Sequence, residues 1–255
     1  MRTVYVIGIG AGDPEHLTLQ AVAAMNRTDV FFTIDKGDAK GDLAALRAEL
    51  LARHVTRPHR VVTARDPERD RGAASARYAD AVTDWQDRRA AVYERMLADE
   101  LGEDGCGAFL VWGDPALYDG TLRILDRIRA RGAVAFDVVS IPGISAVQAL
   151  AAAHRLVLNR VGRPVTVTTG RRLADEGLPP GTDDVVVMLD AVDAFAAVPA
   201  DGWDIYWGAY LGTADQVLVH GDLRRVRDEI AARRAELRAR KGWIMDIYLL
   251  RRRIR

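Results

Sequence analysis

The chain of 255 residues contains 36 basic and 36 acidic side chains, so its formal net charge is zero. This balance argues against nucleic acid or an anionic membrane surface as a partner, because both attract an excess of basic residues. Hydrophobic residues make up 49% of the chain, enough for a large core, and the length suits two domains of about 100–150 residues each. No stretch approaches the ~18 consecutive apolar residues that a membrane span needs.

The cysteine and histidine content argues against two further kinds of site. Cys106 is the single cysteine, so an internal disulfide is impossible, and a lone thiol is typical of a protein of the reducing cytoplasm. Because Cys106 lies within an apolar run, we expect a small core residue and not a nucleophile. The five histidines have no metal-ligand spacing, so no metal site is expected.

The chain begins with the pattern of a strand, a glycine-rich turn and a helix. Residues 8–14 read Gly-Ile-Gly-Ala-Gly-Asp-Pro, and a helical pattern starts near Glu15. Such a turn is typical of a phosphate or dinucleotide site, but the spacing is not G-x-G-x-x-G. The carboxylate of Asp13 would also repel a pyrophosphate. A nicotinamide site is therefore disfavoured, although the next predicted strand does end in an acidic residue, Asp35.

Strand and helix patterns alternate through the first half of the chain. The strands are predicted near 4–9, 30–34, 61–63, 106–112 and 134–141, and the helices near 15–27, 42–52, 75–101, 120–131 and 145–154. This alternation predicts an α/β fold with a largely parallel sheet. A polar loop is expected over 63–74. The long helix belongs to an insert, 65–104, whose large apolar side chains are expected to cover an active site or a dimer partner.

The fourth of these strands ends at the turn Gly113-Asp114-Pro115. Pro115 has no amide hydrogen, so the hydrogen-bond ladder of the strand stops there. Gly113 allows another molecule to approach the backbone closely. Asp114 is then left at the carboxyl end of a strand, where open α/β sheets bind their ligands. The turn therefore predicts a ligand site.

The second half of the chain repeats the α/β pattern. Strands are predicted near 165–169, 185–189, 204–210, 216–221 and 243–251, with the last one inside the sheet and a loop over 173–184. A boundary near 158–164 divides the chain into domains 1–158 and 159–255. The arginine-rich stretch 224–240 has helical spacing, and we expect its charges to form a solvated face.

Four turns, taken together and in this order, resemble the tetrapyrrole methylase family. They are the glycine-rich start, Gly113-Asp114-Pro115, Pro-Gly-Ile-Ser-Ala at 142–146 and Gly-Thr-Ala-Asp-Gln at 212–216. Members of this family methylate corrin and sirohaem precursors with S-adenosylmethionine. The resemblance covers nearly the whole chain. It implies two α/β domains with the cofactor cleft between them, and a homodimer.

Further segments are similar to one branch of the family, in aerobic cobalamin synthesis, which methylates precorrin-5 at C-1 and releases acetate. These segments are 35–43, Asp84-Trp85, the insert and the ending Gly-Trp-Ile-Met-Asp-Ile-Tyr at 242–248. Other acceptors stay open: another precorrin, diphthamide or ribosomal RNA. Outside the family, the alternatives are a nicotinamide-dependent reductase and a binding module without catalysis.

The resemblance also implies site residues. The implied cofactor contacts are Ala11, Trp112, Gly113, Asp114, Leu117, Ser145, Ala146, Met188 or Leu189, and Gly212. Few catalytic side chains are expected, because methyl transfer from a sulfonium mainly needs a positioned donor. The acceptor carries many carboxylates, so Lys36 and Arg163 are candidates for binding it. Release of acetate needs water to attack a ketone, and Asp13 is the candidate general base.

Overall fold

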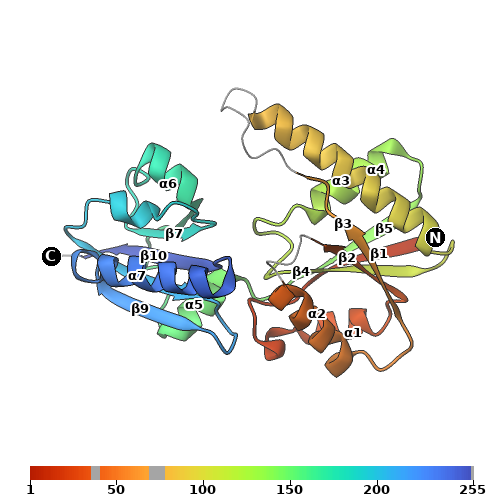
Figure 1. Ribbon diagram of the computed structural model, residues 1–255, viewed down its shortest axis with the longest axis horizontal. Helices are drawn as coiled ribbons and strands as arrows, with labels where there is room; N and C mark the ends of the chain where they lie inside the picture. The colour runs from red at the N-terminus through yellow and green to blue at the C-terminus, as the bar shows by residue number, and fades with distance from the viewer. Residues whose placement is uncertain (36–40, 69–77, 254–255) are drawn as a thin grey trace. The chain divides into compact units, whose positions relative to one another are not determined.

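The computed structural model describes residues 1–35, 41–68 and 78–253, and Lys36 lies outside them. The chain forms two compact units, each built on a five-stranded sheet (Figure 1). The first unit comprises Met1–Gly10 and Pro14–Ile144, and the second comprises Ala11–Asp13 and Ser145–Arg255. The predicted α/β class is confirmed. The second unit begins before the boundary expected at 158/159, because the helix that follows Ile144 packs on the second sheet.

The sheet of the first unit is entirely parallel, with strand order β3-β2-β4-β1-β5. Its strands are β1 (Arg2–Gly8), β2 (Val30–Asp35), β3 (Arg60–Arg65), β4 (Cys106–Val111) and β5 (Phe136–Ile141). Helices α1 (Leu19–Met25) and α2 (Gly41–His54) cover one face, and α3 (Tyr78–Glu100) and α4 (Thr121–Arg131) cover the other (Figure 1). The predicted parallel sheet is confirmed.

Both faces of this sheet are buried, which is typical of parallel sheets. Successive side chains of a strand point to opposite faces. Val4 and Val6 accordingly join the core beneath α3 and α4, while Ile7 joins the core beneath α1 and α2. Phe109 of β4 stacks on Tyr93 of α3, with ring centroids 4.6 Å apart. These two cores hold the carboxyl ends of the strands in place.

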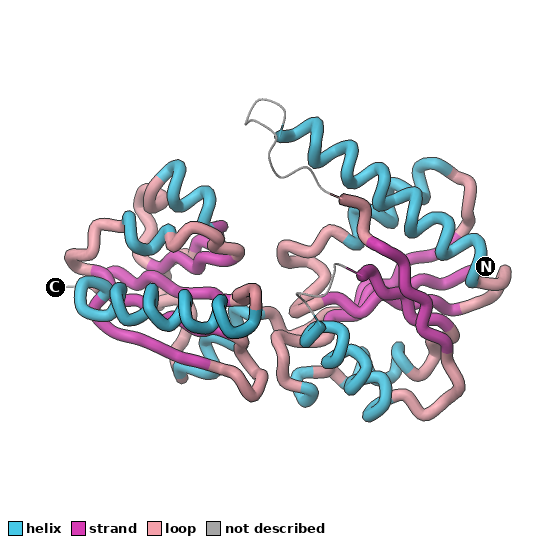
Figure 2. Tube along the Cα trace, viewed as in Figure 1, coloured by secondary structure: helices cyan, strands magenta, loops and turns pink. Residues whose placement is uncertain are grey.

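The sheet of the second unit is mixed, with order β6-β7-β10-β8-β9. Figure 2 draws its strands in magenta and the helices beside them in cyan. Its strands are β6 (Thr166–Thr169), β7 (Asp184–Met188), β8 (Trp203–Ala209), β9 (Val217–Asp222) and β10 (Asp246–Arg252). Strand β10 pairs antiparallel with both β7 and β8, so the prediction of an internal last strand is confirmed. Helices α6 (Gly170–Glu176) and α7 (Leu223–Lys241) share one core, and α5 (Ala146–His154) packs on β8 and β10.

Two predicted elements differ from the structure. Residues 170–176 form α6 where a loop was expected from 173, because this short helix buries only Gly170 and Leu173 and lacks an apolar stripe. The helix expected over 15–27 is instead a 3₁₀ turn, η1 (Pro14–His16), followed by α1. Helix α1 starts at Leu19 because the hydroxyl of Thr18 accepts a hydrogen bond from the Ala21 amide at 3.0 Å.

Candidate functional site

Three backbone segments meet at the carboxyl edge of the first sheet. Gly8 ends β1, Gly113 follows β4 and Gly143 follows β5. A Cβ atom on Gly143 would lie 2.2 Å from the carbonyl oxygen of Gly113 and 2.8 Å from the Cα atom of Gly8. The amide of Gly113 donates to the Gly10 carbonyl at 2.8 Å. We call Gly8, Gly113 and Gly143 the glycine cluster. It packs three turns closely together at the edge where such sheets bind ligands.

Asp114 connects two of these turns. Its Oδ2 atom accepts a hydrogen bond from the Gly143 amide at 2.9 Å, and its Oδ1 atom accepts one from the Ala116 amide at 2.7 Å. Hydrogen bonds to a charged group are stronger than those between neutral groups. The carboxylate therefore fixes the glycine cluster, a role that the sequence alone did not indicate.

Two neighbours of Asp114 have unusual surroundings: the indole nitrogen of Trp112 is buried, and the backbone of Tyr118 is strained. The indole of Trp112 packs on the core beneath α1 and α2, and its buried Nε1 atom has no hydrogen-bond partner among the described residues. The Leu117 amide donates to the Asp114 carbonyl at 3.2 Å, which closes the turn. Tyr118 then has a φ of 54° and is 44% exposed. Non-glycine residues in this conformation are strained and often lie at functional sites.

A cation that the sequence analysis did not single out lies at the end of β4. The Nε atom of Arg47, in α2, donates to the Leu110 carbonyl at 3.1 Å. Burial lowers the pKa of Arg47, while Tyr93 and Asp119 act in the opposite direction. Nothing in the helical pattern of α2 marks this arginine, because its position depends on β4, which is distant in sequence.

Ser145 and Ala146 lie at the start of α5 in the second unit. The Oγ atom of Ser145 accepts a hydrogen bond from the Val147 amide at 3.1 Å, and the Ser145 amide donates to Oε1 of Gln148 at 3.1 Å. The Ser145 hydroxyl also contacts Oε1 of Gln148. These contacts form a reciprocal capping box, and the predicted N-cap is confirmed.

Residues 11–13 lie against the loop that follows β8. A Cβ atom on Gly212 would be 2.6 Å from the Asp13 amide nitrogen and 3.1 Å from its Cβ atom. The Gly212 amide donates to Oε1 of Gln216 at 2.8 Å. Within the second unit the structure thus brings together three predicted site residues, Ala11, Asp13 and Gly212.

The remaining predicted residues lie at the ends of elements. Met188 ends β7, and Leu189 follows it with a φ of 54° and 63% exposure. Arg163 lies exposed in the connection between α5 and β6, where its amide donates to the Arg160 carbonyl at 3.0 Å. Lys36 lies outside the described residues.

The glycine-rich turns of both units lie within the part of the chain that matches a known family. Residues 3–227 match the family described as Tetrapyrrole (Corrin/Porphyrin) Methylases. The chain belongs to the tetrapyrrole methylase family. The resemblance inferred from the four turns is confirmed.

Individual tetrapyrrole methylases give a closer comparison. The chain is 51% identical over 253 residues to a precorrin-6A synthase [deacetylating] of Sinorhizobium sp, which covers 99% of this chain and 96% of that protein. It is 39% identical to a putative cobalamin synthesis related protein (CobF) from Corynebacterium diphtheriae, with a TM-score of 0.84 and 99% of each chain covered. The narrower resemblance is confirmed as well. This tetrapyrrole methylase is an S-adenosylmethionine-dependent methyltransferase of cobalamin biosynthesis.

More distant tetrapyrrole methylases share the fold alone. A solved cobalt precorrin-4 methyltransferase, CbiF, is 16% identical, with 97% of this chain and 94% of that chain covered and a TM-score of 0.62.

No helix among the residues that the structure describes is long and apolar enough to cross a membrane. Across those same residues, no three His, Cys, Asp or Glu side chains gather into a group that would hold a metal ion.

Proposed function

We propose that the protein converts precorrin-5 to precorrin-6A, with methylation of C-1 and release of acetate. The observation that carries this proposal is the 51% identity to a precorrin-6A synthase [deacetylating] over 99% of this chain and 96% of that protein. Agreement over almost the full length of both chains includes the insert and the C-terminal strand, the segments on which the narrower resemblance rests. A cytoplasmic homodimer belongs to the same proposal.

The cofactor of this reaction is S-adenosylmethionine. It would supply a methyl group from its sulfonium sulfur, which would be left as the neutral thioether of S-adenosylhomocysteine. We assign its contacts to Ala11, Trp112, Gly113, Asp114, Leu117, Ser145, Ala146, Met188, Leu189 and Gly212. One distant relative, a uroporphyrin-III C-methyltransferase from Thermus thermophilus that is 16% identical, was solved in complex with S-adenosylhomocysteine.

Three features of the chain support this cofactor assignment. The glycine cluster packs three turns against one another at the strand ends, where open α/β sheets bind their ligands and where Cβ atoms would clash. The buried Nε1 atom of Trp112 is a donor without a described partner, and an unpaired buried donor costs about 1–3 kcal/mol. A ligand acceptor would satisfy it. The apolar side chain of Leu189 is exposed, so it is available to contact a ligand.

The second reaction, loss of the acetyl group, calls for a base. We propose Asp13, whose backbone lies against Gly212. Its carboxylate would take a proton from the water that adds to the acetyl ketone. The carbon–carbon bond to the ring then breaks, its electron pair stays with the ring, and acetate leaves. Lys36 and Arg163 are proposed to bind carboxylates of the acceptor, since charge-assisted hydrogen bonds suit such groups.

The test is transfer of an isotope-labelled methyl group. The protein is incubated with labelled S-adenosylmethionine and, in separate reactions, with precorrin-5 and with earlier precorrins. We expect label in the tetrapyrrole only with precorrin-5. Label in another precorrin would assign a different acceptor. Retention of NADPH in place of S-adenosylmethionine would instead support the nicotinamide-dependent alternative.

A further inference from the structure

The loop between β7 and the 3₁₀ turn η4 (Ala194–Ala197) has an unusual backbone. Leu189 and Asp193 have φ values of 54° and 55°, although neither is glycine. Leu189 and Val192 are each 63% exposed. Such conformations are strained and persist only where surrounding contacts determine them. We call residues 189–193 the β7 loop. The shape of the β7 loop must therefore be set by the buried side chains that contact it.

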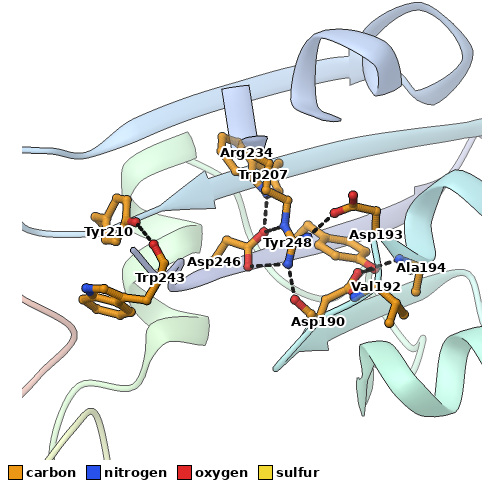
Figure 3. Close-up of polar contacts among 10 residues, drawn as sticks. All are labelled: Asp190, Val192, Asp193, Ala194, Trp207, Tyr210, Arg234, Trp243, Asp246 and Tyr248. Carbon is orange, nitrogen blue, oxygen red and sulfur yellow. Dashed lines mark hydrogen bonds and ion pairs between the residues drawn. The ribbon is translucent and has the colours of Figure 1, made fainter. Parts of the chain in front are cut away.

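Asp190 anchors the β7 loop from below. It is 5% exposed, and its Oδ1 atom accepts a hydrogen bond from the Val192 amide at 3.0 Å. Its Oδ2 atom accepts from the Ala194 amide at 2.8 Å and from the hydroxyl of Tyr248 at 2.8 Å (Figure 3). A Cβ atom on Gly170 would lie 2.5 Å from the Asp190 Cα atom, so α6 closes the remaining side.

Arg234 of α7 holds the same loop through its guanidinium group. The group is buried and donates to the Asp190 carbonyl and to the Asp193 carboxylate (Figure 3). Its Nε atom donates to Oδ2 of Asp246 at 2.7 Å. That carboxylate also accepts from Nε1 of Trp207 at 2.9 Å. Arg234 therefore connects α7, the β7 loop and the start of β10.

Asp246 extends this support to a second loop. The two residues Trp243 and Met245, just before Asp246, bind Tyr210 at the end of β8. The Tyr210 hydroxyl donates to the Trp243 carbonyl at 2.6 Å, and the Tyr210 amide donates to the Met245 carbonyl at 2.9 Å. Tyr210 has a φ of 48° and leads directly into Gly212. The β7 loop and the loop that begins at Tyr210 both have strained backbone, and both connect to the buried charged residues Arg234 and Asp246.

We propose that Arg234, Asp190, Asp246 and Tyr248 form a positioning network that holds both loops in the shape that binds S-adenosylmethionine. The inference rests on the proposed function, which assigns Leu189 and Gly212 to the cofactor. Stability alone accounts poorly for this network, because desolvation of buried ion pairs largely offsets their attraction. These residues act through the loops and need not touch the cofactor.

Two variants test the network, with one matched control. Tyr248→Phe removes a single hydroxyl from the anchor of Asp190, and Arg234→Lys keeps the charge but removes the branched set of donors. The control, Arg251→Lys, disrupts a similar pair at the opposite end of β7, where Arg251 Nε lies 2.5 Å from Oδ1 of the fully buried Asp184. Each protein is titrated with S-adenosylmethionine and with S-adenosylhomocysteine, and its thermal midpoint is measured.

We expect the dissociation constants for both compounds to rise roughly 10-fold in Tyr248→Phe, as loss of one hydrogen bond to a charged group implies. The rise in Arg234→Lys should be larger. In steady-state assays the KM for S-adenosylmethionine should rise while the KM for the tetrapyrrole stays unchanged. Arg251→Lys should lose thermal stability yet bind like the wild type.

Wild-type affinity in Tyr248→Phe and Arg234→Lys would overturn the network, and so would an equal loss of affinity in Arg251→Lys. Failure of the wild type itself to bind S-adenosylmethionine would overturn the proposed function together with this inference.

Discussion

Replacing Gly143 by alanine should strongly disturb the packing of the glycine cluster, because its Cβ atom would make a closer contact than one on Gly8 would. The new Cβ atom would lie 2.2 Å from the Gly113 carbonyl oxygen and 2.8 Å from two backbone atoms of Gly8. All three contacts are with backbone, so no flexible side chain can move aside. The turn after β5 must shift, and the hydrogen bond from the Gly143 amide to Asp114 weakens with it.

The magnitude follows from these contacts. Overpacking by a methyl group costs about 1–3 kcal/mol of unfolding free energy. For a chain of this size, each kcal/mol lowers the thermal midpoint by roughly 2–4 °C, so we expect a drop of about 2–12 °C. Loss of a hydrogen bond to a charged acceptor adds about 1.5–3 kcal/mol to the free energy of the cofactor-binding turn, which predicts a ~10–150-fold weaker affinity for S-adenosylmethionine.

Calorimetric titration and thermal unfolding measure the two effects separately. Gly102→Ala is the control, since its Cβ atom would meet nothing within 4 Å. If Gly143→Ala matches this control in both measurements, the packing described here is wrong. If it loses stability but binds the cofactor normally, the packing stands and the cofactor assignment of the turn fails.

Three further outcomes are expected. Asp13→Asn keeps the shape of the turn but removes the base, so mass analysis should find methylated product that retains its acetyl group; full deacetylation at the wild-type rate would exclude Asp13 as the base. Burial lowers the pKa of His154 below its ordinary value of 6.5, so the folded state resists protonation and stability should fall as the pH drops below about 6.5. Denaturant titrations should find this pH dependence reduced in His154→Gln, and an unchanged slope would contradict the assignment. Light scattering should give twice the mass of the 28.0 kDa chain, and a monomer at micromolar concentration would refute the dimer.

The turns of the site were predictable because their determinants are local in sequence. Gly113 and Pro115 mark the end of β4, and a serine before an apolar stretch marks the cap of α5. Each depends on residues within a few positions. A strand that ends where a proline removes the next donor needs no knowledge of the rest of the chain.

The charged network of the second unit was not predictable in this way. Residues 224–240 were expected to form a helix with solvated charges, yet Arg234 is 3% exposed. Its partners Asp190 and Asp246 lie 44 and 12 residues away. Only the packing of α7 against β8 and β9 brings them together. The linking role of Asp114 was missed for the same reason, since Gly143 lies 29 residues further along the chain.

Mass analysis of the product formed from precorrin-5 and S-adenosylmethionine is the decisive test of the proposed reaction. We expect a tetrapyrrole that has gained one methyl group and lost its acetyl group, with one acetate released per methyl transferred. A product that gains a methyl group without release of acetate, formed by the wild-type protein, would contradict it.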